Sequence, residues 1–360
     1  MTSDMKQTGG KLYDQGGYGC VFLPTLTCAP GSEQRATDEE SGSGIRFIDK
    51  LMDPDNALIE YTVAQHVRRI PLWKNYFIIP VSTCTPAPEA QQSEQQLRMC
   101  DVIDGNPIQQ FRLLRMPFGG MPLSHAYLRM DRDGDAVYSF LLHFLEGCAM
   151  LQMFGIVHRD LHQGNILVDS AGVPRIIDFN LSIDIRRPLV DQTELLHGIG
   201  YDLFQEPPDS CIINAVAQGK DGFDAIEKFL TLRKSLVKVQ SLLGITKDNM
   251  RNELQYYIRH SKSVQTGNIV KWFQTYWHTV DTWAVGMNMV MLLIDNLRWP
   301  TFARGEYQTY KHRLLPILRD MLQCNPTKRI DCVQALARLD ADNYIIRTYG
   351  RKWLDARKGR

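Results

Sequence analysis

The sequence predicts an α+β fold in which a smaller strand-rich part is followed by a larger, mainly helical part. Apolar residues alternate over residues 45–52, as expected of a half-buried strand. Later in the chain they recur at helical spacing, along 135–154 and again along 229–243. Because 360 residues are enough for two lobes with a substantial core, we place an amino-terminal lobe at 1–117 and a carboxy-terminal lobe at 118–360.

The charge of the chain is almost balanced, with 41 basic and 40 acidic side chains. This balance argues against a protein that coats nucleic acid or lies on a membrane surface. Residues 1–11 are polar and do not resemble a secretory signal, and the apolar helical stretch 283–294 is too short to cross a bilayer. We therefore expect no membrane contact and no nucleic-acid partner.

The eight cysteines include no CxxC pair, which favours a reducing compartment such as the cytoplasm over a disulfide framework. Four of them fall in the predicted small lobe, namely Cys20, Cys28, Cys84 and Cys100. One alternative is a metal site, but we expect ordinary thiols. The segments 29–44 and 85–106 are rich in Gly, Ser, Glu, Gln or Pro and are predicted to be flexible loops.

A short segment from Val157 to Asn180 concentrates groups suited to phosphoryl transfer. Asp160 is an acid that can accept a proton from a hydroxyl group. Asn165 and Asp178 supply an amide and a second carboxylate that can hold Mg²⁺ against nucleotide phosphates. Phosphoryl transfer needs little more from a protein than positioning and charge neutralisation, so these three side chains predict a catalytic centre.

The same segment resembles the catalytic loop and the magnesium loop of the eukaryotic-type protein kinases, written His-Arg-Asp-x₄-Asn and Asp-Phe-Gly. The resemblance implies a bilobal protein-kinase-like fold, with a small β-rich N-lobe containing one helix and a large, mainly helical C-lobe. It also implies ATP and Mg²⁺ as cofactors, with Mn²⁺ as an alternative metal ion. The other kinase motifs should then follow in the family's order.

The first of these motifs is the glycine-rich loop, G-x-G-x-[FY]-G-x-V, which the chain matches from Gly16 to Val21 although Asp14 replaces the first glycine. Glycines let a backbone approach phosphates closely, but a plain hairpin turn is the alternative interpretation. Lys50 stands at the position of the family's strand lysine. The apolar spacing of 56–70 predicts a helix on which Glu60 either pairs with Lys50 or is an exposed carboxylate.

A strand and a hinge are matched by residues 111–120. By resemblance, Leu114 lies at the back of the adenine pocket, and the backbone of 115–117 forms hydrogen bonds to the base. The nucleotide-binding residues that the resemblance implies are Gly16, Gly17, Tyr18, Gly19, Val21, Ile48, Lys50, Leu114, Arg115, Met116, Pro117 and Leu167.

Two downstream motifs belong to the large lobe. Asp281 begins a sequence that resembles a kinase signature whose aspartate braces the catalytic loop, and Arg329 matches the arginine that pairs with the acid ending the activation segment, here Asp209. Asp209 and Asp281 are 72 positions apart (281 − 209), whereas in the family a short loop separates them. Residues 212–276 are therefore predicted to be a mostly helical insertion, with either a purely structural role or a role in docking partners.

Two positions depart from the family pattern. His162 stands where kinases acting on serine or threonine usually have a lysine, and the surrounding Asp-Leu-His-x-Gly-Asn resembles aminoglycoside and choline kinases. We expect His162 either to donate a hydrogen bond to phosphate in its protonated form or to form only local hydrogen bonds. Asn180 replaces the glycine of Asp-Phe-Gly, and the turn can survive because asparagine tolerates left-handed dihedral angles.

The activation segment offers candidates for regulation. Arg159 precedes the catalytic aspartate, as in kinases whose activation segment is ordered by phosphorylation. The hydroxyls available to pair with it after phosphorylation belong to Ser182, Thr193 and Tyr201. Phe179 is expected to pack beneath the regulatory helix.

Together these motifs predict an ATP-dependent protein kinase that transfers the γ-phosphoryl group to serine or threonine hydroxyls of protein substrates. The predicted catalytic residues are Asp160, Lys50, Glu60 and His162, and the predicted metal ligands are Asn165 and Asp178. The alternatives are a pseudokinase scaffold and a small-molecule phosphotransferase. The insertion, the sequence around Gly19 and the basic tail also resemble the serine/threonine kinases of large DNA viruses, which implies a host-cytoplasm or virion location.

Overall fold

The computed structural model describes residues 10–35, 46–88, 94–126, 136–197 and 200–357. These residues form two compact units: the first comprises 1–120 with 177–180, and the second comprises 121–176 with 181–360. The first boundary thus lies at Gly120, close to the expected lobe boundary at 117. Ile45, Asp135 and parts of the predicted loops 29–44 and 85–106 lie outside the described residues.

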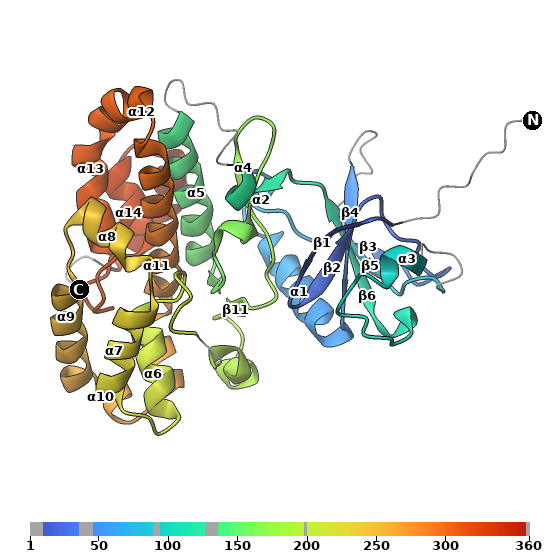
Figure 1. Cartoon of the computed structure of the whole chain (residues 1–360), viewed down its shortest axis with the longest axis horizontal. Helices are drawn as coiled ribbons and strands as arrows, with labels where there is room; N and C mark the ends of the chain where they lie inside the picture. Colours follow the sequence, from blue (N-terminus) through green and yellow to red (C-terminus); the bar gives the residue numbers. More distant parts are fainter. Residues whose placement is uncertain (1–9, 36–45, 89–93, 127–135, 198–199, 358–360) are drawn as a thin grey trace, which may run out of the picture. The chain divides into compact units, whose positions relative to one another are not determined.

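The first unit is built on a six-stranded antiparallel sheet in the order β1-β2-β4-β6-β5-β3 (Figure 1). Its strands are β1 (Leu12–Gly16), β2 (Gly19–Phe22), β3 (Gln34–Arg35), β4 (Phe47–Met52), β5 (Ser82–Cys84) and β6 (Arg112–Pro117). The expected strand at 45–52 is therefore present as β4. The β4–β6 ladder at the centre of the sheet places Lys50 opposite Leu114.

The predicted helix at 56–70 is α1 (Pro54–Val67), which packs against β6. It begins at Pro54 because the Asp53 carboxylate accepts hydrogen bonds from the backbone N–H groups of Asp55 and Asn56. The unit also contains shorter helical segments, so the expectation of a single helix is wrong. They are α2 (Trp73–Tyr76), α3 (Glu94–Leu97) and η2 (Ile108–Gln110).

The cysteines of the first unit correct two expectations. Cys20 is bonded to Cys100, and Cys28 to Cys84, so these residues form two disulfides instead of free thiols or a metal site. Such bonds persist mainly in oxidising environments, and the reducing compartment stays a prediction. The segment 94–106 is also not a loose loop, because Leu97, Cys100 and Ile103 are buried in the core of this unit.

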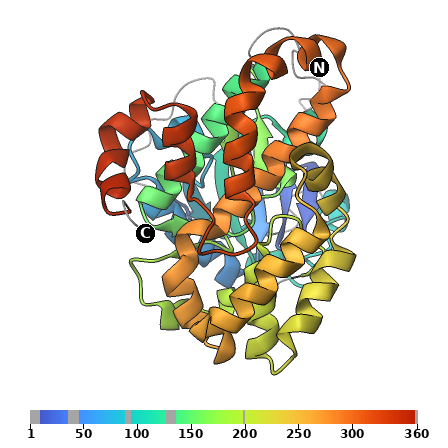
Figure 2. The same ribbon diagram turned by 90° about the vertical axis from the view of Figure 1, so that its left-hand side faces the viewer.

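The second unit is mainly helical, and its long helices lie against one another (Figure 2). The predicted helix at 135–154 is α5 (Ala136–Met153), whose apolar face packs against α11 (Ile269–Leu297) and α14 (Cys332–Leu339). The other helical segments after the insertion are α12 (Pro300–Arg304), α13 (Glu306–Met321), η5 (Ile346–Gly350) and α15 (Arg351–Asp355).

Short strands and turns of the second unit carry the catalytic-loop sequence. A three-stranded sheet has the order β10-β9-β7, and β8 pairs with β11. The elements are β7 (Met121–Pro122), α4 (Leu123–Ala126), β8 (Ile156–Val157), η3 (Gln163–Asn165), β9 (Ile166–Val168), β10 (Pro174–Ile176), β11 (Ile183–Asp184) and η4 (Leu189–Leu196). The catalytic loop therefore runs between two strand pairings that hold its ends.

The predicted insertion is helical, and side chains cap the start of two of its helices, α7 and α9. Asp221 accepts hydrogen bonds from two backbone N–H groups at the start of α7, and Thr246 and Asn249 form a capping box at the start of α9. Its helices are α6 (Pro208–Ala217), α7 (Gly222–Leu232), α8 (Leu236–Leu243), α9 (Lys247–His260) and α10 (Lys262–Gln265). The predicted end at 276 falls inside α11, because this helix already begins at Ile269.

By length and composition, α5 is the one helix among the described residues that could cross a membrane. However, 61% of that stretch is buried inside the protein, as in the core helix of a globular unit.

Candidate active site

In the first unit, Lys50 is held between two carboxylates. Its Nζ lies 2.9 Å from Oε2 of Glu60 on α1 and 2.8 Å from Oδ1 of Asp178. Lys50 is 8% exposed and Glu60 is 1% exposed. The predicted contact between Lys50 and Glu60 is thus confirmed, and the alternative of an exposed Glu60 is wrong.

This cluster has one positive and two negative groups. Burial by itself would lower the pKa of Lys50, but the carboxylates of Glu60 and Asp178 raise it above the usual range, so Lys50 stays protonated. Burial raises the pKa of Glu60 to about 7; Lys50 opposes this rise and Asp178 adds to it. Because the cluster has two carboxylates and only one ammonium group, it can accept a further cation at Asp178.

Asp178 lies in a strained backbone conformation, with φ of 65°. A non-glycine residue in this region is uncommon and is typical of functional sites. The tolerance of asparagine for left-handed angles is not used at Asn180, since the positive φ of this turn lies two residues earlier, at Asp178. The neighbouring Phe179 is fully buried. Its ring and that of Phe77, which directly follows α2, form a T-shaped pair with centroids 6.0 Å apart.

The glycine-rich sequence forms a β-hairpin with Gly17 and Tyr18 at its turn. A Cβ atom on Gly19 would lie 2.5 Å from the carbonyl oxygen of Leu51, so β2 can approach β4 this closely only with glycine there. A Cβ on Gly16 or Gly17 would meet nothing within 4 Å. The backbone at the turn is therefore open where the Cβ atoms of Gly16 and Gly17 would lie, and Tyr18 is exposed.

In the hinge, Arg115 is engaged in the fold through its backbone and its side chain. Its carbonyl oxygen already accepts a hydrogen bond from the backbone N–H of Val81 at 2.7 Å, and its guanidinium lies 2.9 Å from the buried carboxylate of Asp49. Pro117 has no N–H to donate. A backbone N–H of Pro117 therefore cannot contact the base, whereas base contacts through the backbone carbonyls of 115–117 stay a prediction. The other hinge-side candidates form an apolar wall: Leu114 is fully buried, Ile48 and Met116 are nearly so, and Val21 is half-buried.

In the second unit, the catalytic loop is fastened by one buried carboxylate. Asp281 on α11 accepts hydrogen bonds from the backbone N–H groups of His158 at 2.6 Å and Arg159 at 2.8 Å. This confirms the predicted bracing. Burial raises the pKa of Asp281, while His158 and Arg159 hold it down. Arg159 itself has φ of 69°, so the backbone just before Asp160 is strained and is held in place by this carboxylate.

Asp160 and Asn165 are brought together by the same loop. The amide nitrogen of Asn165 donates to the carbonyl oxygen of Asp160 at 2.9 Å and to its Oδ2 at 3.2 Å. This orientation reserves the amide oxygen of Asn165 as the atom that would bind a metal ion. Leu167 follows on β9 and is nearly buried.

His162 is tied to its own loop. Its Nδ1 accepts a hydrogen bond from the backbone N–H of Gly164 at 3.0 Å, and its Nε2 lies 3.6 Å from Oδ2 of Asp160. A Cβ on Gly164 would come within 2.7 Å of the imidazole ring, which explains the His-x-Gly spacing. A doubly protonated His162 would have to give up the bond to Gly164, so the geometry favours the alternative of a local structural role.

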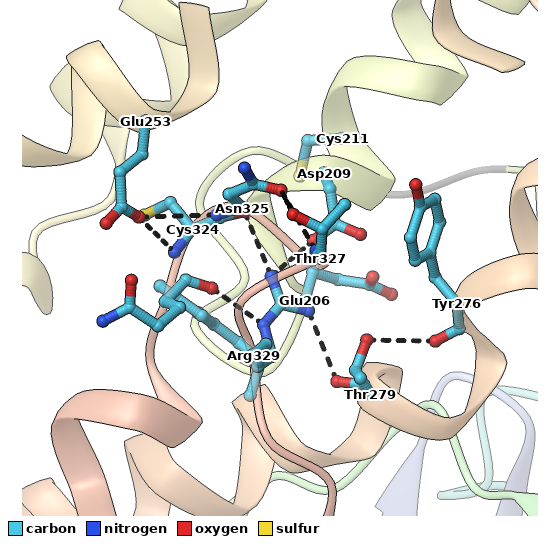
Figure 3. Close-up of polar contacts among 12 residues, drawn as sticks. Glu206, Asp209, Cys211, Glu253, Tyr276, Thr279, Cys324, Asn325, Thr327 and Arg329 are labelled. Carbon is cyan, nitrogen blue, oxygen red and sulfur yellow. Dashed lines mark hydrogen bonds and ion pairs between the residues drawn. The ribbon is translucent and has the colours of Figure 1, made fainter. Parts of the chain in front are cut away.

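The predicted pair of Asp209 and Arg329 is confirmed at 2.6 Å, with both side chains fully buried. Figure 3 shows Arg329 among the carbonyl groups and the carboxylate that surround it. Its guanidinium also donates to the carbonyl oxygens of Gln323 at 2.9 Å and Cys324 at 3.2 Å, and Asp209 accepts a second bond from Trp272. A buried charge pair needs such additional bonds, because each ion has lost its hydration.

Sequence reasoning missed two residues beside Asp160. Gln205 donates a hydrogen bond to Oδ1 of Asp160 at 3.0 Å. Glu206 is buried; burial raises its pKa to about 7, while Arg159 and Arg233 hold the pKa down. Neither residue stands in a family motif that would have marked it.

Ser182 and Tyr201, both proposed for phosphorylation, differ in what the fold engages: the hydroxyl of Ser182 and the backbone carbonyl of Tyr201. Ser182 is buried, and its hydroxyl lies 3.4 Å from the carbonyl oxygen of His158, so a phosphate could not be added there without opening the loop. The carbonyl of Tyr201 accepts a bond from Arg233, and burial raises the pKa of its phenol. Thr193 lies half-buried in η4.

The predicted site residues thus form two groups. Lys50, Glu60 and Asp178 meet in the first unit, whereas Asp160, His162 and Asn165 meet in the second. Within the described residues, no group of three or more His, Cys, Asp or Glu side chains forms a metal site by itself. The predicted metal ligands Asp178 and Asn165 belong to different units, and both offer the hard oxygen atoms that Mg²⁺ prefers.

Residues 124–196 match the family model for protein tyrosine and serine/threonine kinases. The matched range contains Asp160, Asn165 and Asp178, and therefore members of both groups of the candidate site, but Lys50 and Glu60 lie outside it. The match supports the kinase resemblance and phosphoryl transfer by a protein kinase. It does not separate tyrosine from serine/threonine specificity, because the family includes both.

Proposed function

We propose that this protein is an ATP-dependent protein kinase that phosphorylates serine or threonine hydroxyls of protein substrates. The observation that carries the proposal is the buried contact of Lys50 with both Glu60 and Asp178, at 2.9 and 2.8 Å. A solvated lysine on a strand would not be held between two carboxylates, of which Glu60 is fully buried and Asp178 is half-buried. A lysine fixed in this way is suited to bind phosphates, and Asp178 beside it is suited to bind the metal ion that accompanies them.

The roles follow from the contacts of each group. Lys50 would position the phosphates, Glu60 would keep Lys50 in place, and the open backbone at Gly16 and Gly17 would let the phosphates approach the hairpin turn. Mg²⁺, with Mn²⁺ as the alternative, would be held by Asp178 and the amide oxygen of Asn165 and would neutralise phosphate charge.

Asp160 would take the proton from the substrate hydroxyl. The hydroxyl oxygen then forms the new bond to the γ-phosphorus while the bond from that phosphorus to ADP breaks. Asp281 contributes indirectly, because it holds the backbone from which the Asp160 side chain projects. His162 would complete the loop through its bond to Gly164.

The experiment that tests this function uses purified protein, γ-labelled ATP, Mg²⁺ or Mn²⁺, and mixed protein substrates. We expect labelled phosphoserine or phosphothreonine after hydrolysis of the products. Asp160→Asn should reduce the rate by orders of magnitude while leaving ATP binding nearly intact, because the loss falls mainly on the transition state. Label on tyrosine alone would contradict the serine/threonine assignment.

Two other outcomes would point to the alternatives. ATP binding without transfer to any substrate would favour a pseudokinase scaffold. Transfer only to an aminoglycoside or to choline would favour a small-molecule phosphotransferase, which the sequence around His162 and Gly164 resembles. Against the latter stand the contacts of Asp281 and the pair of Asp209 and Arg329, which are features of protein kinases.

The narrower likeness to kinases of large DNA viruses belongs to this proposal too. It rests on the insertion and on the sequence around Gly19. A virion, outside the reducing cytoplasm, would be compatible with the two disulfides of the first unit.

A further inference from the structure

Arg233 is an arginine of the predicted insertion that lies inside the protein. It directly follows α7 as its C-cap, is 1% exposed, and has its guanidinium 4.5 Å from the ring centre of Phe229. Burying a guanidinium is costly unless its N–H groups find partners, so its hydrogen bonds indicate what it does.

The guanidinium holds one short stretch of the activation segment at both ends. Its Nε donates to the carbonyl oxygen of Tyr201 at 3.1 Å, and its Nη1 donates to the carbonyl oxygen of Glu206. Its Nη2 lies 3.5 Å from Sγ of Cys211. The planar fork of an arginine spreads its donors over three nitrogens and can bind two separate carbonyls in one fixed geometry, whereas a lysine carries its donors on a single nitrogen.

Residues 201–206 are held at a third point between these two. The indole Nε1 of Trp283 on α11 donates to the carbonyl oxygen of Phe204 at 3.0 Å. Three backbone carbonyls within six residues are thus bound by buried side chains. The conformation of this stretch is therefore set by the rest of the unit and not by local sequence.

The stretch in turn fixes Asp160. Gln205 is 6% exposed, and its side-chain amide donates to Oδ1 of Asp160 at 3.0 Å. Asn165 donates to the other oxygen, Oδ2, at 3.2 Å. The carboxylate of Asp160 is thus oriented from both sides, once by its own loop and once by the stretch that Arg233 holds.

We propose that Arg233 is a positioning residue for phosphoryl transfer, acting on Asp160 through residues 201–206 and Gln205, so that the insertion is a working part of the catalytic unit. This inference rests on the proposed kinase function. A shift of a reacting group by about 1 Å can lower the rate about a hundredfold. Loosening residues 201–206 should therefore displace the Asp160 carboxylate and lower the rate of transfer.

The test compares Arg233→Met with Lys234→Met, which removes the same charge from the adjacent exposed residue. We expect Arg233→Met to lower kcat by roughly 10- to 100-fold with the KM for ATP unchanged, and Lys234→Met to change neither. Arg233→Lys should recover only part of kcat, because an ammonium carries its donors on one nitrogen and lacks the wide, planar spacing of a guanidinium. An unchanged kcat in Arg233→Met would overturn the proposal.

A double-mutant cycle separates positioning from a general structural effect. If Arg233 acts through Gln205, Arg233→Met should lower kcat in the Gln205→Ala background by far less than in the wild type. If the two losses simply multiply, the proposal is wrong. A higher kcat in Gln205→Ala would also overturn it, since Gln205 would then obstruct Asp160. Arg233→Lys replaces Arg233→Met in the cycle if the methionine variant does not fold.

A measurement independent of turnover keeps this inference distinct from the proposed function. Backbone hydrogen exchange over residues 201–206 should be about tenfold faster or more in Arg233→Met, and unchanged in Lys234→Met. If the wild type transfers no phosphate, the kinase assignment fails. Faster exchange in Arg233→Met would still show that Arg233 holds residues 201–206. Unchanged exchange over residues 201–206 in Arg233→Met would show that Arg233 does not hold this stretch, whether or not the wild type is active.

Discussion

The two disulfides of the first unit should determine its stability. Cys20–Cys100 and Cys28–Cys84 join residues 80 and 56 positions apart. In the chain-entropy description, loops of this length correspond to about 4.5 and about 4 kcal/mol of stabilisation at 25 °C. Each value is comparable to a large part of the net stability of a folded domain. Reduction should therefore loosen the first unit and leave the second, whose four free cysteines are buried, nearly unchanged.

The first measurement is a count of thiols. Alkylation of the unfolded protein without reductant should modify four cysteines, and alkylation after reduction should modify all eight. Hydrogen exchange with and without dithiothreitol then reports on each unit separately, because exchange is read peptide by peptide. Modification of eight cysteines without reductant would refute the reasoning at once.

A matched variant assigns the effect to one bond. In Cys20→Ala/Cys100→Ala, dithiothreitol can break only the Cys28–Cys84 bond, so its effect on exchange in the first unit should be smaller than in the wild type. An equal effect in both proteins would show that the Cys20–Cys100 bond contributes nothing.

Three further predictions concern single side chains. Arg329→Met should cost about 3–5 kcal/mol, because it leaves a fully buried carboxylate without its partner; thermal unfolding would show this as a large fall in Tm, and a loss below about 1 kcal/mol would contradict it. The pKa of Glu206 is raised from 4.5 to about 7, so protonated Glu206 stabilises the fold fully below pH 4.5. As the pH rises through about 7 this contribution is lost, and the free energy of unfolding falls by at most about 3 kcal/mol. Glu206→Gln should flatten the fall in unfolding free energy over this range, whereas the exposed Glu194→Gln should not. Gly19→Ala should destabilise the first unit by about 1–3 kcal/mol through its clash with the β4 backbone, whereas Gly17→Ala should be nearly neutral; equal hydrogen exchange in both variants would argue against this.

Much of the fold followed from local patterns. The alternation at 45–52 and the helical spacing at 56–70 and 135–154 correspond to β4, α1 and α5 with ends shifted by a few residues. These patterns are readable because side-chain direction repeats every two residues in a strand and every 3.6 in a helix. The pairs of Lys50 with Glu60 and of Asp209 with Arg329 were found through motif order alone.

Only the tertiary structure could show contacts between residues far apart in the chain that no motif marks. The bond between Cys20 and Cys100 gives no local signal, because the two residues meet only when the sheet and the 94–106 segment fold together. The same holds for Arg233, whose carbonyl partners lie 32 and 27 residues earlier. A hydrogen bond to a backbone carbonyl depends on where that carbonyl points and not on which side chain its residue carries. The sequence around 201–206 therefore could not predict the contacts with Arg233.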